Sequence, residues 1–419
     1  MSLNSNGGNA AHFTIIARLG NLGDDSARGK QLGASWRFYE RYYLVYSNTS
    51  VNKKNILWGY LMFFNKKGML MLVLMMVFSI ILVACGSEET QTEGNENGAS
   101  GDETYHWKFV TEEFQGQVQY EYAAEFANRL KEKSDGRITM DVYEFGGLGS
   151  EVNQVELLQS GGVEFAIVSP GFTGTMVSEG QLFALHFLFT DDMELNQQIL
   201  DESEALNVHL TEKYEAFNIS PLAYWTEGAM QWTGDRPLRT PADFDGFLMR
   251  TQTSPLILES YRAYGANPQE LSWGELYTSL QQGVVQGQEN PIFFIEDAKF
   301  HEVQDHMTIS EHNIYVAMTT VNTDFFNGLP TDIQDMILET VEEMRPVAYE
   351  MQERMNEELL DSIIDNDTYP TEVYELTAEE REAFRELAIP VRDFFIDENG
   401  ADAEFILNML IEEIEAAQN

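Results

Sequence analysis

The chain has 419 residues, of which 69 are Asp or Glu and 25 are Lys or Arg, so that its net charge is -44 at neutral pH. A negative field of this size repels nucleic acid and anionic lipid, which excludes nucleic acid as a partner. The charge is compatible either with a protein that works in concentrated salt, where screening weakens self-repulsion, or with an ordinary solvated acidic surface.

Residues 1–61 are predicted to be an upstream extension that takes no part in the fold. They begin rich in Gly and Asn and contain no long periodic apolar stretch. The dipeptide Trp58-Gly59 supports this interpretation, because its codons are purine-rich, as a ribosome-binding site just ahead of Met62 would be. We therefore expect translation to begin at Met62, and a cellular product that retained residues 1–61 would contradict this.

Residues 62–84 have the pattern of a bacterial lipoprotein signal peptide. Two lysines at 66–67 precede a run of about fifteen mostly apolar residues at 69–83, which is short for a membrane-spanning helix. The letters LVAC at 82–85 resemble a lipobox, in which the cysteine sulfur is lipidated. We expect Cys85, the only cysteine, to anchor an exported protein to the cell membrane, at the periplasmic or the extracellular face. The alternative is an uncleaved helix with an incidental buried cysteine.

Residues 85–103 are predicted to form a flexible tether between the lipid anchor and the folded part. From residue 86 to residue 102 the chain consists mainly of Glu, Thr, Gly, Asn and Ser and has no large apolar side chain that could form a core. Roughly 315 residues of ordinary hydrophobic content follow, which is more than one core usually holds. Two domains are therefore expected.

The folded part begins with alternating strands and helices. Apolar periodicity predicts strands at 107–111, 137–145 and 163–170 and helices at about 123–130 and 151–159, with Ser134-Asp135-Gly136 and Gly161-Gly162 ending the two helices. This order predicts a parallel sheet with its ligand crevice at the carboxyl ends of the strands. The loops at 112–117 and 169–174 follow two of these ends and are expected to carry ligand contacts.

The last third of the chain is predicted to be helical. Residues 329–364 form a long, acidic, apolar-periodic segment in which Pro346 predicts a kink. Thr377 and Glu380 have the spacing of a capping box at the start of another helix.

Several motifs with specific spacing lie between residues 244 and 296. They are an arginine ending a strand, Gly-Ala-x-Pro, Trp-Gly-Glu-Leu-Tyr and Gly-Gln-Glu-Asn-Pro, at 250, 265–268, 273–277 and 287–291. The pattern resembles the solute receptors of tripartite ATP-independent periplasmic (TRAP) transporters, the DctP family, from about residue 107 to at least residue 336. One departure is Gln286, where the family usually has aspartate; we expect it to alter a loop contact rather than the ligand.

The resemblance implies an α/β, two-lobed fold like that of periplasmic binding proteins, with a ligand cleft between the lobes and a long helix spanning both. The receptor would close on a small carboxylate and deliver it to a permease driven by a sodium gradient. The expected crossings between the lobes are at 224–228 and 314–317. The expected lobes are 104–227 plus 316–355 for lobe I, and 228–315 plus 356–419 for lobe II.

Arg250 is the first candidate ligand-binding residue. In the family the arginine at this position binds the ligand carboxylate, and a guanidinium suits this role because it is always charged and offers a planar fork that matches a carboxylate. On the residues alone, an arginine ending a buried strand more often pairs with a carboxylate of the protein itself. Finding Arg250 outside a cleft, or locked to a neighbouring side chain, would overturn the receptor hypothesis.

Within the family, the motifs are most similar to those of receptors for ectoine and hydroxyectoine, which are ring-shaped zwitterions. The matching segments are TEEFQGQVQ, SPGFTG, RTQTSPL, SWGELY and GQENPIF, which begin at residues 111, 169, 250, 272 and 287. The resemblance implies Arg250 and Asn290 for the carboxylate and either Glu112 or Glu113 for the amidinium. It also implies aromatic walls, for which Phe172, Trp273 and Tyr315 are the candidates, although phenylalanine is expected at 315 and each aromatic residue could instead be core.

The sequence also bears on alternative ligands and on alternative classes of protein. The resemblance disfavours a sialate, because the sialic-acid receptors of the family use a second arginine and none lies at 227–230. A monocarboxylate, keto acid or dicarboxylate is the alternative ligand. The sequence has no Gly-x-Ser-x-Gly, His-Glu-x-x-His or phosphate-binding glycine loop, so no enzyme activity, cofactor or metal is expected. A surface lipoprotein without a transport role is the remaining alternative, and it predicts neither a closed cleft nor stabilisation by a ligand.

Overall fold

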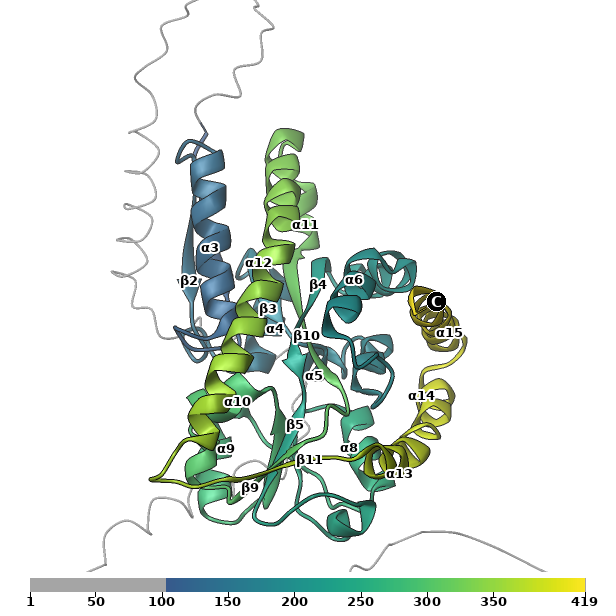
Figure 1. Cartoon of the computed structure of the whole chain (residues 1–419). Helices are drawn as coiled ribbons and strands as arrows, with labels where there is room; N and C mark the ends of the chain where they lie inside the picture. The colour runs from purple at the N-terminus through teal and green to yellow at the C-terminus, as the bar shows by residue number, and fades with distance from the viewer. Residues whose placement is uncertain (1–102, 419) are drawn as a thin grey trace, which may run out of the picture. The chain divides into compact units, whose positions relative to one another are not determined.

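The computed structural model describes residues 103–418 (Figure 1). The predicted upstream extension, the signal peptide, the lipidation of Cys85 and nearly all of the tether lie outside the described residues. Within residues 103–418, none of the helices combines the length and the apolar character needed to cross a bilayer.

A five-stranded sheet forms one part of the fold, in the order β2-β1-β3-β10-β4. Its strands are Ile138–Tyr143, Tyr105–Val110, Phe165–Val168, Ile314–Asn322 and Ile219–Ala229, respectively. Strands β1, β2 and β3 are parallel, as predicted, with Tyr105 opposite Ile138 and Phe109 opposite Phe165. The prediction of a parallel sheet was incomplete, because β10 runs antiparallel to both β3 and β4.

Helices cover this sheet where the apolar spacing predicted them. Helix α3, Val118–Lys133, buries Tyr122, Phe126 and Leu130 against the sheet, and the Tyr122 ring stacks on that of Trp225 in β4 with ring centroids 4.9 Å apart. Helix α4, Glu151–Ser160, ends at Gly161, whose left-handed φ of 73° favours glycine. The short elements that complete this part are α5 Pro170–Thr173, η2 Ser178–Ala184, α6 Met193–Glu202, η3 Ala205–Leu210, α7 Thr211–Glu215 and α11 Thr323–Asn327.

A second sheet has the order β11-β9-β5-β8, with strands Glu372–Glu375, His306–Ile309, Gln231–Gly234 and Gly287–Asn290. A separate pair, β6 Arg250–Thr251 and β7 Gln269–Glu270, is parallel. Gly287 is required in β8, because a Cβ there would lie 2.3 Å from the Thr233 carbonyl oxygen. The remaining elements here are η4 Pro241–Phe244, α8 Pro255–Ala263, α9 Trp273–Gln281, α10 Ile292–Asp297 and η5 Phe300–Glu302.

The long helix α12, Thr331–Ile364, spans both parts, as expected. It packs against α3 and β4 of the first part and against α10 of the second, and Figure 1 shows it extending past both sheets. The helix continues through Pro346. It therefore links the two parts in addition to the connections between the sheets from β4 to β5 and from β9 to β10.

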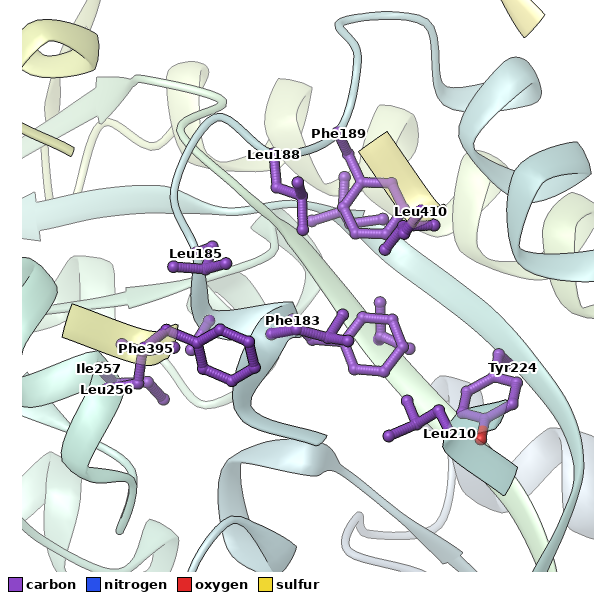
Figure 2. Close-up of a cluster of buried hydrophobic side chains, with 14 of the residues drawn as sticks. Phe183, Leu185, Leu188, Phe189, Leu210, Tyr224, Leu256, Ile257, Phe395 and Leu410 are labelled. Carbon is purple, nitrogen blue, oxygen red and sulfur yellow. The ribbon is translucent and has the colours of Figure 1, made fainter. Parts of the chain in front are cut away.

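Three C-terminal helices, α13 Ala378–Ala388, α14 Val391–Asn399 and α15 Ala401–Ala417, complete the chain. The predicted capping box of Thr377 and Glu380 is present at the start of α13. Helix α14 packs on α8, whereas α15 packs on α6 and η3. Figure 2 shows the shared core, in which Phe395 and Leu410 of these helices lie among side chains of the segment around Phe183.

Candidate functional site

Six of the seven predicted ligand-binding side chains line one cavity, and most of the residues around it are buried. The lining residues are Glu112, Gln119, Glu151, Phe172, Arg250, Gln252, Trp273, Asn290, Phe294 and Tyr315. The first part of the fold contributes the loop after β1, helices α3, α4 and α5, and strand β10. The second part contributes strands β6 and β8, the residue after β6, and helices α9 and α10. The cavity therefore lies at the carboxyl ends of parallel strands, where the strand order predicted a ligand.

Arg250 is buried in the cavity wall without an anionic partner. Its side chain is 2% exposed, and Nε and Nη2 donate to the Leu271 carbonyl oxygen at 3.1 and 2.9 Å. Within residues 103–418 it forms no ion pair with a carboxylate. Burial lowers the pKa of the guanidinium, and the nearby Glu151 carboxylate opposes that shift. A buried arginine stays charged, so this site favours an anion from outside the chain.

Glu112 lies in the same cavity and keeps one unsatisfied carboxylate oxygen. Its Oε2 accepts a hydrogen bond from the Ser169 backbone N–H at 3.1 Å, whereas its Oε1 is buried and has no partner in the part of the chain described. Burial raises the pKa of Glu112 well above its usual range. A ligand N–H group would satisfy Oε1 and favour the ionised carboxylate.

Glu113 faces away from the cavity, which separates the two glutamates that the sequence left as alternatives. Its Oε2 accepts from the Gln119 backbone N–H at 2.7 Å, and the Gln119 amide in turn donates to Glu227 Oε1 at 2.9 Å. Burial, together with the charge of Glu227, raises the pKa of Glu113 well above its usual range. Glu113 therefore belongs to a buried carboxyl pair behind the cavity wall.

The carboxyl pair predicts a pH-dependent stability. Burial raises the pKa of Glu227 from 4.5 to about 7, so the folded protein binds more protons than the unfolded chain between these values. The stabilising contribution is complete below about pH 4.5 and is lost as the pH rises through about 7. In thermal unfolding at several pH values, the Tm of Glu227→Gln should fall less over this interval than that of the unchanged protein.

The matched control for this prediction is Glu132→Gln. Glu132 is exposed on α3, so its substitution removes one negative charge without removing the buried group. If Glu227→Gln and Glu132→Gln gave the same dependence of Tm on pH, the buried pair would not be the source of the effect.

Aromatic rings form much of the remaining cavity wall. Phe172 and Tyr315 are buried, and Trp273 at the start of α9 is partly buried. The Phe294 ring lies between those of Trp273 and Tyr315, with centroids 5.1 and 5.6 Å away. Aromatic faces of this kind attract a delocalised cation.

Asn290 reaches the cavity from the end of β8. Its side chain lies on the same face of the strand as that of Gln288, to which its amide donates. The intervening Glu289 points to the other face, where its Oε2 accepts from the Tyr261 hydroxyl at 2.5 Å and lies 2.7 Å from His312 Nε2. Strand alternation therefore assigns Asn290 to the cavity and Glu289 to a neighbouring hydrogen-bond network.

The sequence interpretation missed four lining residues, Gln119, Glu151, Gln252 and Phe294. Gln119 and Gln252 lie inside segments that carried the family resemblance, Phe294 directly follows one of them, and Glu151 begins a predicted helix. Nothing in the spacing distinguished these side chains from their neighbours. Glu151 has a visible role, because its Oε1 accepts a hydrogen bond from the Trp273 backbone N–H at 2.9 Å at the start of α9. A carboxylate at a helix N-terminus is a favourable arrangement, and here it joins the two parts of the fold.

The chain has relatives of known function. The model of the DctP family, "bacterial extracellular solute-binding protein, family 7", matches residues 109–399. The chain is 34% identical over 314 residues to the ectoine-binding periplasmic protein TeaA of Halomonas elongata, covering 75% of this chain and 91% of TeaA. It is 32% identical over 313 residues to the ectoine/5-hydroxyectoine-binding periplasmic protein UehA of Ruegeria pomeroyi, covering 75% and 91%. It is also 34% identical over 281 residues to the C4-dicarboxylate-binding periplasmic protein DctP of Rhodobacter capsulatus, covering 67% and 83%.

A solved structure agrees with these relatives. The structure of the periplasmic ectoine-binding protein of the TeaABC TRAP transporter of Halomonas elongata superimposes with a TM-score of 0.72 at 34% identity, covering 74% of this chain and 99% of that one. Both the sequence and the two-lobed fold therefore agree with one family. The chain belongs to the DctP family of TRAP-transporter solute-binding proteins, a family of periplasmic receptors rather than of enzymes.

Proposed function

We propose that this receptor captures ectoine or hydroxyectoine and delivers it to the membrane permease subunits of a TRAP transporter. Arg250 and Asn290 bind the carboxylate, Glu112 binds the amidinium, and the aromatic side chains of Phe172, Trp273 and Tyr315 enclose the ring. The observation that carries the proposal is that, within the described residues, one cavity holds a guanidinium without an ionic partner and a carboxyl oxygen without a hydrogen bond. Arg250 has no carboxylate partner in residues 103–418, and Glu112 has an oxygen without a hydrogen bond.

The charge distribution favours a zwitterion over a dianion. Glu112 and Glu151 both line the cavity together with Arg250, so the chain places two carboxyl groups and one guanidinium there. A second carboxylate on the ligand would have to lie near Glu112, and an unpaired buried carboxylate is costly. A ligand with one carboxylate and one delocalised cation can pair its carboxylate with Arg250 and its cation with Glu112.

The relatives support this ligand and also define the alternative. TeaA and UehA bind ectoine-type solutes, whereas DctP of Rhodobacter capsulatus binds C4-dicarboxylates. The raised pKa of Glu112 gives the alternative a physical basis, because a protonated Glu112 could donate a hydrogen bond to a second carboxylate. The alternative function is therefore a receptor for a dicarboxylate or another small organic acid.

We propose hinge closure as the mechanism. Lobe I, 104–227 plus 316–355, and lobe II, 228–315 plus 356–419, enclose the ligand between Glu112 and Phe172 on one side and Arg250 on the other. The ligand contacts both lobes only when they are closed, so binding selects the closed state, which the permease then recognises. Crossing segments in β4 and β10 provide the hinge.

We also propose that the exported receptor is attached to the membrane through a lipid on Cys85. The support is the pattern of residues 62–85, with lysines, an apolar run and the letters LVAC. Residues 86–102 then form the tether that lets the receptor reach the permease.

Titration calorimetry of the purified protein tests the ligand. We expect ectoine or hydroxyectoine to bind in preference to succinate, pyruvate and galactonate. Binding of succinate alone would replace the proposal with the dicarboxylate alternative, and binding of none of these solutes would contradict the proposed ligand class.

Trp273→Ala should weaken binding without unfolding the protein. One contact between an aromatic face and the ligand cation is lost, which contributes about 0.5–2 kcal/mol. Calorimetry measures the affinity, and Tm in the absence of ligand should change little because Trp273 is only partly buried. An unchanged affinity together with a large fall in Tm would show that Trp273 serves the core instead.

A further inference from the structure

A second cavity, lined mostly by buried side chains, lies beside the proposed ligand cavity. The two cavities share Gln252 and Tyr315 in their linings. Gln252 Nε2 donates a hydrogen bond to the Tyr315 hydroxyl at 3.1 Å, so this pair forms part of the boundary between the cavities. Gly171 allows the close approach of Gln252, because a Cβ at Gly171 would lie 1.8 Å from Gln252 Oε1.

Polar atoms without partners line the second cavity. The Ser169 side chain is 1% exposed, and its Oγ forms no hydrogen bond within the described part of the chain. The Asn313 Oδ1 atom is likewise buried without a partner there. Buried polar atoms normally have hydrogen-bond partners, so two orphaned atoms in one cavity indicate a hydrogen-bonding occupant.

Ser169 lies where the two cavities meet. Its backbone N–H donates to Glu112, the proposed amidinium partner, at 3.1 Å. Burial raises the pKa of Tyr315 well above its usual range. Tyr315 is therefore a neutral phenol that can still donate a hydrogen bond while accepting one from Gln252.

We infer that Ser169, Gln252 and Tyr315 form a hydroxyl-binding subsite beside the ring site, and that the receptor binds hydroxyectoine more tightly than ectoine. This inference rests on the proposed function and names the substrate within it. A hydroxyl group both donates and accepts, as do the hydroxyl, amide and phenol that face it.

The subsite is unsuited to a further charge on the ligand. An added anion would lie near Glu112 and Glu289, both of which are buried. The three side chains of the subsite are neutral, so they offer no counterion to an added cation. If ectoine, which lacks the hydroxyl, is bound, the Ser169 Oγ must bind water or stay without a hydrogen bond. Because a buried polar atom without a partner is costly, the site discriminates against the ligand that lacks the hydroxyl.

The test compares the Kd values of hydroxyectoine and ectoine for the purified protein by titration calorimetry. We expect hydroxyectoine to bind about 3- to 10-fold more tightly, the ratio expected for one net hydrogen bond. Tyr315→Phe and Ser169→Ala should each move this ratio toward one. The control Tyr349→Phe removes a phenol hydroxyl from α12, away from both cavities, and should leave the ratio unchanged.

The ratio of the two Kd values distinguishes a defect in the hydroxyl subsite from a defect in the site that holds the ring. A loss of affinity that is equal for both ligands would mean that Tyr315 only shapes the cavity wall. If both solutes bind equally well to the unchanged protein, or if neither Tyr315→Phe nor Ser169→Ala alters the ratio, the subsite is refuted while the proposed function stands. If neither solute binds, the proposed function fails and the subsite fails with it.

Discussion

Arg250→Ala is expected to reduce the affinity for the carboxylate ligand by about 3–5 kcal/mol, or at least 100-fold, as measured by titration calorimetry. The ligand carboxylate would then be buried in the cavity without its counterion, and the desolvation penalty would no longer be offset. Arg250→Lys keeps a positive charge but loses the planar fork, so it should restore only part of the affinity.

The empty protein should tolerate this substitution. Arg250→Ala removes two hydrogen bonds to the Leu271 carbonyl oxygen, but it also removes a buried charge that has no ionic partner in residues 103–418. We therefore expect a small change in Tm without ligand and a large loss of ligand-induced stabilisation. Arg262→Ala, at an exposed arginine of α8, is the matched control. Near-normal affinity in Arg250→Ala would mean that Arg250 only supports the Leu271 backbone.

Glu112→Gln should weaken zwitterion binding by about 1.5–3 kcal/mol, because a charge-assisted hydrogen bond to the amidinium becomes a neutral one. The same substitution should leave succinate binding unchanged or improve it, since the negative wall of the cavity is reduced. Calorimetry with both ligands measures the two effects. Because burial raises the pKa of Glu112 in the free protein, zwitterion affinity should also increase with pH as the carboxylate ionises.

Glu113→Gln is the control for this second prediction. Glu113 is the adjacent residue, equally buried, but it faces Glu227 instead of the cavity. Its substitution should leave the preference between the two ligands intact. If Glu113→Gln altered the preference as much as Glu112→Gln, or if Glu112→Gln abolished succinate binding and spared ectoine, the proposed role of Glu112 would be wrong.

The sequence predicted the parts of the fold that depend on local periodicity. The strands and helices from Tyr105 to Ser160, the end of α4 at Gly161 and the capping box at Thr377 all lie close to where apolar spacing and cap residues placed them. The antiparallel direction of β10 was not predictable in this way. Strand direction depends on the pairing of segments far apart in the chain, and β10 pairs with β3 about 150 residues earlier.

The candidate site was predictable to the level of motifs but not of individual side-chain directions. Glu112 and Glu113 both follow β1, and which of them faces the cavity depends on how the chain turns after Val110 and on the distant Glu227. The same reason explains why Gln119, Glu151 and Gln252 were overlooked. Their roles arise from contacts made across the fold, such as that between Glu151 and the start of α9.

The hydrogen bond from the Trp273 backbone N–H to Glu151 has a consequence for how tightly any solute is held. It joins the two parts of the fold directly, as does the bond from the Gln117 amide to Asp297 at 2.6 Å. Some of the free energy of closing thus comes from the protein itself, and the solute supplies only the remainder. The observed Kd equals the intrinsic Kd divided by the fraction of receptor that is already competent to bind. Residues that never touch the solute therefore help to set the concentration at which uptake begins.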